Sequence, residues 1–224
     1  VCVCRRPARP GAWRRCWPPE RVCMPDARWR AVNSNFVPLE ADLTVIVRAS
    51  AWFMQALVAA RTLGLSSWCI GAGAVRNLVW DHLHGYTTPT ELSDIDLVYF
   101  DLQEPADHER IHQQALAARC PGLPWEVTNQ AHVHRWFEQH FGYAVAPFGS
   151  LSEAVASWPE YASCVGVVLH ADNSIAILAP HGLEDLFSLR IRRNPQRVSV
   201  ATYRERVASK RYGERWPRVT VTQA

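Results

Sequence analysis

Hydrophobic positions in this chain first follow helical spacing and then form short apolar runs separated by amphipathic segments. Between Leu39 and Leu63 apolar residues recur every three or four positions, which predicts one or two amphipathic helices ending at Gly64. Ser67–Ile70 is a short apolar run typical of a strand, and residues 74–84 return to helical spacing. The first part of the chain therefore predicts helices followed by a strand and another helix.

The remaining segments continue this alternation. The pattern predicts a strand, a helix, a strand and a helix in turn, over Asp94–Phe100, His108–Ala118, Trp125–Thr128 and Gln130–Phe141. It then predicts a short helix, a hairpin and two further helices, over Leu151–Ser157, residues 165–169 with 175–178, His181–Leu189 and Ser199–Tyr212. Such alternation predicts an α+β (mixed α/β) fold with a short mixed sheet flanked by helices, and active groups at the strand ends.

Composition agrees with a globular domain. The 224 residues are 48% hydrophobic and include ten tryptophans, enough for a substantial core. The longest apolar candidate, Leu43–Leu63, is interrupted by two arginines and a glutamine, and the N-terminal residues lack the apolar stretch of a secretory signal. We therefore expect no membrane association and a cytoplasmic location.

The first 38 residues differ from the rest in charge. Residues 1–30 carry eight arginines against two acids, a balance of +6 that leaves −3 for the rest of a chain whose total is +3. We predict an irregular basic leader over residues 1–38, either disordered or an over-long start with Met24 as the true beginning, and one domain over residues 39–224. The leader cysteines match no usual zinc spacing; they are Cys2, Cys4, Cys16 and Cys23.

The segment from Trp68 to Phe100 carries the candidate chemistry. Gly71 and Gly73 lie in a predicted strand-to-helix turn, where glycine allows backbone to approach a ligand and a helix N-terminus attracts phosphate. Asp94 and Asp96 lie two apart on the next predicted strand, so their carboxylates point to the same side. Paired carboxylates favour a cation such as Mg²⁺ between them, and the combination indicates phosphoryl transfer.

These motifs resemble the nucleotidyltransferase superfamily typified by DNA polymerase β and the tRNA CCA-adding enzymes. Ala72–Asn77 is similar to the Gly-Gly-x-Val-Arg-Asp motif of the CCA-adding enzymes, and Asp94-Ile95-Asp96 to their acid pair. A more specific resemblance, over about Ala51–Val221, is to a bacterial nucleotidyltransferase-like family of unknown acceptor, through GAGAVRNLVWD, SDIDLVYFD, PWEVTNQAHVH and APHGLEDLF. Because Ala72 and Asn77 depart from the CCA-adding pattern and the turn-to-acid loop is longer, CCA addition itself is disfavoured.

The resemblance implies a minimal nucleotidyltransferase core and assigns roles to three acids. Asp94 and Asp96 would hold Mg²⁺ against a nucleoside triphosphate, and Glu126 on the third strand would be the third metal ligand or would accept the proton of the attacking hydroxyl. Such sites use two ions about 3.5–4 Å apart, with Mn²⁺ as an alternative to Mg²⁺. The reaction would transfer a nucleoside monophosphate to a hydroxyl acceptor and release pyrophosphate. Asp101 is a rival third acid, but it lies on the opposite strand face.

Three polar residues complete the predicted nucleotide site beside Gly71 and Gly73. Arg76 would meet phosphate with its planar guanidinium, or would instead form an ion pair with Asp81 or Asp94. Asn77 would contact ribose or phosphate, or hold the adjoining loop. Asn129, directly after the third strand, would contact the nucleotide edge or the acceptor, since ligand sites favour strand ends.

Other enzyme classes fit the sequence poorly. A dinucleotide-binding fingerprint fails because Arg76 stands where its third glycine would be, and a serine hydrolase would need a nucleophile elbow that the chain lacks. His132 and His134 lie two apart on a predicted helix and cannot share a face, which disfavours zinc and leaves solvent-facing or capping roles.

The acceptor is the least defined part of the prediction. The mild acidity of residues 39–224 disfavours a long nucleic acid, since neutralising its phosphates requires a basic surface. A small molecule or a protein side chain is favoured over RNA, with tRNA as the remaining nucleic-acid candidate. The second hypothesis is a catalytically inactive nucleotide-binding or regulatory module of the same fold.

Overall fold

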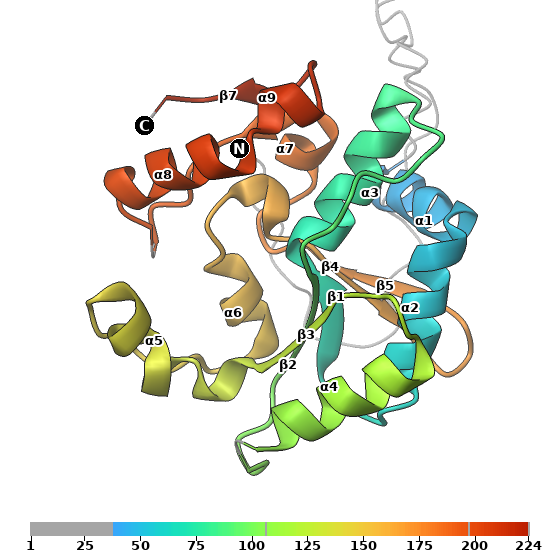
Figure 1. Cartoon of the computed structure of the whole chain (residues 1–224), viewed down its shortest axis with the longest axis vertical. Coiled ribbons are helices and arrows are strands. Elements are labelled where there is room, and N and C mark those ends of the chain that lie inside the picture. Colours follow the sequence, from blue (N-terminus) through green and yellow to red (C-terminus); the bar gives the residue numbers. More distant parts are fainter. Residues whose placement is uncertain (1–37, 106, 197, 224) are drawn as a thin grey trace, which may run out of the picture. The chain divides into compact units, whose positions relative to one another are not determined.

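A five-stranded mixed sheet forms the centre of the fold (Figure 1). The computed structural model describes residues 38–105, 107–196 and 198–223, excluding the side chains of His140 and Phe141, so of the predicted leader only Pro38 is described. These residues belong to a unit that spans Val37–Ala224. The strands are β1 Trp68–Gly71, β2 Ile95–Tyr99, β3 Trp125–Asn129, β4 Gly166–Leu169 and β5 Ile175–Leu178.

The order of the strands is β3-β2-β1-β4-β5. β2 and β3 are parallel and are connected through a helix, as a parallel pair requires, whereas the other three pairings are antiparallel. The predicted α+β class with a short mixed sheet flanked by helices is confirmed.

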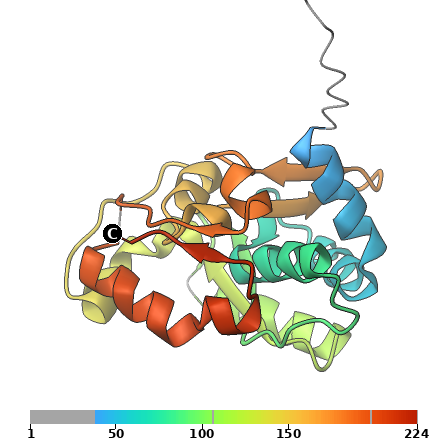
Figure 2. The ribbon, with the colours of Figure 1, turned by 90° about the horizontal axis from the view of Figure 1, so that it is seen from above.

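Helices surround this sheet. The α-helices are α1 Leu39–Ala49, α2 Ala51–Arg61, α3 Ala72–His84, α4 His108–Arg119, α5 His134–Phe141, α6 Leu151–Ala156, α7 Glu184–Phe187, α8 Val200–Lys210 and α9 Tyr212–Arg215. Two 3₁₀ turns are η1 Gln130–His132 and η2 Tyr161–Ser163, and a small parallel pair is formed by β6 Arg190–Ile191 and β7 Thr220–Val221. Figures 1 and 2 both show α8 on one side of the sheet, away from α1 and α2.

Most predicted elements are present, with differences at their ends. The helix predicted over Gln130–Phe141 is divided into η1 and α5, and only Glu184–Phe187 of the predicted His181–Leu189 segment is α-helical. The last predicted helix ends at Lys210 because Arg211 adopts a left-handed conformation with φ +51°. The β6–β7 pair was not predicted, since two-residue strands leave no readable alternation.

α1 and α2 meet at a sharp bend of 93°. Ser50 separates them and caps α2, because its hydroxyl accepts a hydrogen bond from the Phe53 amide at 3.4 Å. Within the described part of the chain no single helix is long and apolar enough to cross a membrane, although this bent pair passes the same test when its helices are taken together.

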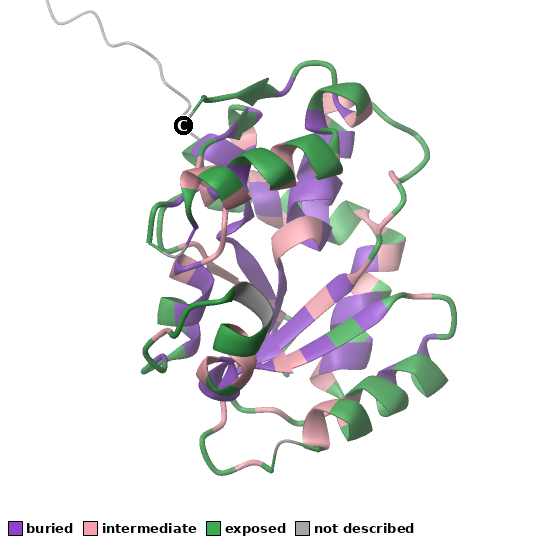
Figure 3. Cartoon of the chain, turned by 60° about the vertical axis from the view of Figure 1, so that its left-hand side comes forward, coloured by how far each residue is buried: buried purple, intermediate pink, exposed green. Residues whose placement is uncertain are grey.

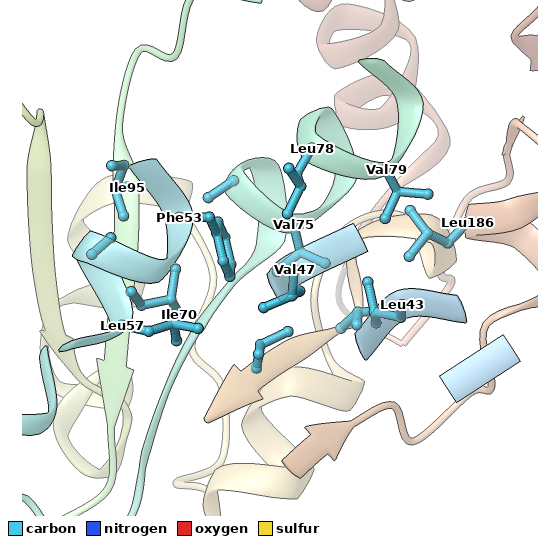
Figure 4. Close-up of a cluster of buried hydrophobic side chains, with 14 of the residues drawn as sticks. Leu43, Val47, Phe53, Leu57, Ile70, Val75, Leu78, Val79, Ile95 and Leu186 are labelled. Carbon is cyan, nitrogen blue, oxygen red and sulfur yellow. The ribbon is translucent and has the colours of Figure 1, made fainter. Parts of the chain in front are cut away.

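The main core lies on one face of the sheet (Figure 4). Ile70 of β1 and Ile95 of β2 pack there with Phe53 and Leu57 of α2 and with Val75 of α3, all fully buried. Figure 3 shows a largely buried sheet and exposed outer faces on the helices around it.

A smaller core lies on the opposite face of the sheet. Cys69 and Val98, which are paired across β1 and β2, pack there against Leu151 and Val155 of α6. Asp94 and Asp96 precede Val98 by two-residue steps, so they lie on this second face.

The C-terminal segment is anchored by an aromatic cluster. Trp216 is fully buried, its ring packs edge-on against Trp80 at 5.2 Å between centroids, and its indole nitrogen donates a hydrogen bond to Asp81 Oδ1 at 2.7 Å. Tyr212 packs on the other side of Trp80 at 5.9 Å. These contacts fasten α9 to α3.

Replacing Trp216 should therefore loosen this end of the domain. We expect Trp216→Ala to reduce the free energy of unfolding by about 3–5 kcal/mol, because it leaves a large cavity. Trp216→Phe keeps an aromatic ring on Trp80 but loses the indole donor and part of the packing volume, so its cost should be smaller, about 1–3 kcal/mol. Urea denaturation checks both values, and equal losses for the two variants would show that packing on Trp80 is not the main contribution.

Candidate functional site

Two carboxylates lie side by side at the beginning of β2 and β3. In the parallel register Asp96 is paired with Glu126, so the two side chains project from the same face. Asp94 is on that face two residues earlier; it is half-buried and accepts a hydrogen bond from the Ser93 hydroxyl at 2.9 Å. The structure thus brings together the three acids that the sequence singled out, with Glu126 the most exposed.

The close grouping of the three acids changes the pKa of Asp96. Burial, together with the neighbouring charges of Asp94 and Glu126, raises its pKa to about 7, against the opposing influence of Lys210 and Arg76. A carboxyl with so high a pKa is one whose ionised form lacks sufficient positive charge nearby.

The donor set suits divalent cations that prefer oxygen. Asp94, Asp96 and Glu126 offer carboxylate oxygens, which are the ligands that Mg²⁺ prefers. Their oxygens do not all lie within 4.8 Å of one another in the described structure. A pair of ions about 3.5–4 Å apart would match such a spread better than a single ion. The residues present therefore fit a two-ion site.

A cavity of about 340 Å³ adjoins the acids. Asp94, Asp96 and Val98 from β2 and Thr128 from β3 form part of its lining, and Glu126 precedes Thr128 on the same strand face. Aromatic side chains contribute a second part, namely Trp136, Phe137, Tyr143, Phe148 and Trp158. Cations contribute a third part, namely Arg76, Arg206 and Lys210. The cavity thus combines acids, aromatic rings and cations.

Arg76 is a buried cation held by aromatic rings. It is 4% exposed, and its guanidinium lies 5.5 Å from the Trp80 ring centroid and 5.0 Å from that of Tyr212. It donates hydrogen bonds to Ser163 Oγ at 2.9 Å and Asn77 Oδ1 at 3.0 Å, whereas its buried Nε has no partner among the described residues. The alternative of an ion pair with an acid is wrong within the described residues. Its charge is available to an anion in the cavity.

Arg206 and Lys210 bring positive charge to the cavity from α8. Glu160, which is fully buried, pairs with Arg206 through two contacts, from Nε at 2.8 Å and from Nη2 at 3.2 Å. This bidentate pair fixes the guanidinium at the cavity wall. Neither cation was predicted as a site residue, although Lys210 is the sole lysine in the sequence.

The two glycines of the turn have different roles. A Cβ on Gly71 would lie 2.6 Å from the Trp158 ring and 2.9 Å from the Val165 carbonyl oxygen, so this glycine is required for packing. It is absent from the cavity lining among the residues described, and the prediction that it contacts the ligand is not supported by its position. Gly73 does line the cavity, beside Ala72, whose φ of +50° is in the left-handed region that favours glycine.

Asn77 and Asn129 are engaged within the protein. Asn77 is 3% exposed and accepts its hydrogen bond from Arg76. Asn129 is 1% exposed, accepts from the Asp101 and Ala131 amides and donates to the Asp101 carbonyl, so it links the ends of β2 and β3. In the described structure neither residue lines the cavity, and their positions indicate supporting roles rather than the predicted nucleotide contacts. Local spacing alone did not reveal these partners.

His132 also differs from expectation. It is 5% exposed, and neither ring nitrogen has a hydrogen-bond partner among the described residues, so the predicted solvent-facing or capping role is wrong for this residue.

The average charge of the domain conceals a strong segregation. Residues 190–218 carry ten lysines and arginines against two acids, Glu205 and Glu214. A second hollow, of about 670 Å³, is lined by Lys210, Arg211 and Arg215 and by the acids Glu91 and Glu214, and it shares Lys210 with the first cavity. Glu214 pairs with Arg211, so the excess of positive charge here is modest and only weakens the argument from mild overall acidity.

Comparisons with known proteins agree with the family resemblance and with the fold. A sequence profile of a family described as nucleotidyltransferase matches residues 58–221. An NMR structure described as revealing a CCA-adding enzyme head domain superposes with a TM-score of 0.71 at 26% identity, covering 82% of this chain and 96% of that one. A CCA-adding enzyme in complex with CTP gives a TM-score of 0.48 at 11% identity, covering 83% of this chain and 43% of that one. The search of curated proteins finds no match.

The contrast between the two glycines can be tested directly. We expect Gly71→Ala to lower the free energy of unfolding by about 1–3 kcal/mol, because the Val165 carbonyl is backbone and cannot move away easily. Gly73→Ala is the matched control, since its Cβ would meet only the Arg76 side chain at 3.6 Å. Its effect should stay within about 1 kcal/mol. Thermal and urea unfolding measure both; similar losses would contradict the packing role of Gly71.

The raised pKa of Asp96 predicts a pH-dependent cost of holding the acids together. Between pH 3.8, the ordinary pKa of this group, and about pH 7, Asp96 keeps its proton in the folded protein but has lost it in the unfolded chain. The contribution of Asp96 to the free energy of unfolding is therefore lost as the pH rises through that range. In metal-free protein we expect Asp96→Asn to raise the free energy of unfolding at pH 8 by roughly 1–3 kcal/mol, with little gain at pH 4.

Denaturation in the presence of a chelator measures this difference. Glu126→Gln should also stabilise the metal-free protein at pH 8, because it removes one of the charges acting on Asp96. A gain from Asp96→Asn that is equal at both pH values would contradict the electrostatic explanation.

Proposed function

The chain belongs to the nucleotidyltransferase family, and from this premise we propose that it is a Mg²⁺-dependent enzyme that transfers a nucleoside monophosphate from a nucleoside triphosphate to a hydroxyl acceptor. The observation that carries the proposal is the grouping of Asp94, Asp96 and Glu126 beside a cavity that Arg76, Arg206 and Lys210 also line. A nucleoside triphosphate carries several negative charges, so its binding needs both acids that hold metal ions and positively charged side chains.

The acids would hold the metal ions. Asp94 and Asp96 would bind them from β2 and Glu126 from β3, which accounts for an acid group whose charge the protein alone does not balance. When bound, Mg²⁺ would neutralise phosphate charge, make the acceptor hydroxyl easier to ionise and stabilise the negative charge on the leaving pyrophosphate. Mn²⁺ has the same preference for carboxylate oxygen.

The remaining cavity residues would orient the donor. Arg76 and Lys210 are placed to receive the triphosphate, and the rigid pairing of Arg206 with Glu160 keeps a third positive group at the wall. The aromatic side of the cavity offers flat apolar surface of the kind on which bases stack. Positioning and charge stabilisation of this kind supply most of the catalysis in phosphoryl transfer.

The transfer itself exchanges one bond to phosphorus for another. The acceptor oxygen forms a bond to the α-phosphorus while the bond from that phosphorus to the pyrophosphate oxygen breaks. Glu126, which is exposed at the edge of the acid group, is placed to accept the hydroxyl proton. Pyrophosphate leaves with the electron pair of the broken bond.

The acceptor would approach from the second hollow, which shares Lys210 with the donor cavity. Because Arg211 pairs with Glu214, Lys210 and Arg215 are the cations there that would favour an acceptor carrying negative charge. The concentration of cations in residues 190–218 weakens the electrostatic objection to RNA and places tRNA alongside phosphorylated small molecules as a candidate.

Incubation with α-labelled nucleoside triphosphates, Mg²⁺ and cell extract tests this function. We expect label to enter one acceptor fraction with release of pyrophosphate, and Asp94→Asn or Asp96→Asn to reduce the rate at least roughly 100-fold, as loss of a metal ligand should. Chelation of the metal should abolish transfer in the wild type.

Asp101→Asn is the matched control, because this acid lies beyond the other end of β2 and its carboxylate binds the Gln103 and Glu104 amides. Its transfer rate should remain within a few-fold of wild type. Nucleotide binding without turnover across metabolite and RNA acceptors would instead favour an inactive nucleotide-binding module.

A further inference from the structure

Three metal-binding side chains converge at the opposite end of β2 from the acids. Glu104 Oε1 lies 2.7 Å from His112 Nε2 and 3.1 Å from His108 Nδ1. Across the described residues this is the one group of three His, Cys, Asp or Glu side chains whose ligand atoms all lie within 4.8 Å of one another. The cluster is separate from the proposed catalytic site.

The sequence explains how the two histidines meet. They lie four residues apart on α4, so both rings point from the same helix face. Their ring centroids are 6.1 Å apart at an interplanar angle of 85°. Glu104 reaches them from the loop between β2 and α4, so this cluster joins the loop to the helix.

The second carboxylate oxygen of Glu104 lies beside a buried tyrosine hydroxyl. Glu104 and Tyr99 interact through their side chains, although neither Glu104 Oε2 nor the Tyr99 hydroxyl has a hydrogen bond of good geometry to a described residue. Tyr99 also packs edge-on against His112 at 5.5 Å, so the imidazole has a fixed orientation.

We infer that Glu104, His108 and His112 form a second metal site, for a divalent transition metal ion of the Zn²⁺ type. Two imidazoles and one carboxylate match the ligand preference of Zn²⁺, whereas Mg²⁺ prefers oxygen ligands alone. Zn²⁺ bound tetrahedrally at about 2.0–2.2 Å separates its ligand atoms by roughly 3.3 Å, so the two contacts between Glu104 and the histidines need to lengthen by less than about 1 Å.

The site has an accessible fourth position. The His108 side chain is 41% exposed, against 15% for His112 and 12% for Glu104, so solvent reaches the cluster from the His108 side. A water molecule would complete the coordination. The ion would fasten the β2–α4 loop, in which Asp101 is bonded to Asn129 at the end of β3, and so would brace the sheet end opposite the acids.

Zinc titration of the full-length protein, first freed of metal and then held in excess Mg²⁺, tests this assignment. We expect His108→Asn and His112→Asn each to weaken binding of one Zn²⁺ at least tenfold, and the double variant to lose that ion. His82→Asn is the matched control, since it removes an exposed helical histidine from α3 and should bind Zn²⁺ as the wild type does. Zn²⁺ should also raise the unfolding temperature of the wild type and His82→Asn more than that of the double variant.

Substitution with Co²⁺ identifies the ligands, because the leader cysteines would give thiolate charge-transfer bands that imidazole and carboxylate ligands lack. We expect visible bands without thiolate features, and their loss in the double variant. Circular dichroism confirms folding of each variant, and the more exposed His108 provides the substitution least able to disturb packing. Zinc binding by the cluster variants that equals that of His82→Asn in number and affinity would overturn the assignment.

Discussion

The parallel register of β2 and β3 is the constraint on which the proposed site depends. Backbone hydrogen bonds hold Asp96 beside Glu126 whatever the repulsion between their charges, and the turn before β2 adds Asp94. The ladder and the core on its far face therefore supply the free energy that keeps the acids together. A divalent cation bound between the acids would replace their mutual repulsion by attraction to the ion. The same arrangement that destabilises the metal-free domain would then stabilise the metal-bound domain.

Local spacing was sufficient to predict the acid pair and the alternation of strands and helices. The two-residue period placed Asp94 and Asp96 on one face, and the resemblance to known motifs selected Glu126 as their companion. Both inferences depend on one strand or on adjacent ones. The positions of Arg206 and Lys210 depend instead on α8 folding back across more than 100 residues, a long-range packing outcome that spacing does not encode.

The same limit explains the residues whose positions differ from the prediction. Gly71 was read as a contact for ligand, but its missing side chain makes room for Trp158, which lies far along the chain. Asn129 does lie at a strand end, as the last residue of β3, yet its side-chain amide is already used by the Asp101 backbone. His108 and His112 show the converse: their four-residue spacing was visible, whereas the approach of Glu104 required the folded loop.

The aromatic support of Arg76 gives the end of the chain a role beyond covering the core. Tyr212 lies against the guanidinium, and Trp216 packs edge-on against Trp80, the other ring beside it. A shortened chain that stopped before Tyr212 would retain each of the acids and Arg76 itself, but would lose the Tyr212 ring and the Trp216 contact that supports Trp80. The last few turns are therefore part of the support for the cavity wall that we propose to bind phosphate, and any boundary drawn inside them would divide the proposed site rather than trim a tail.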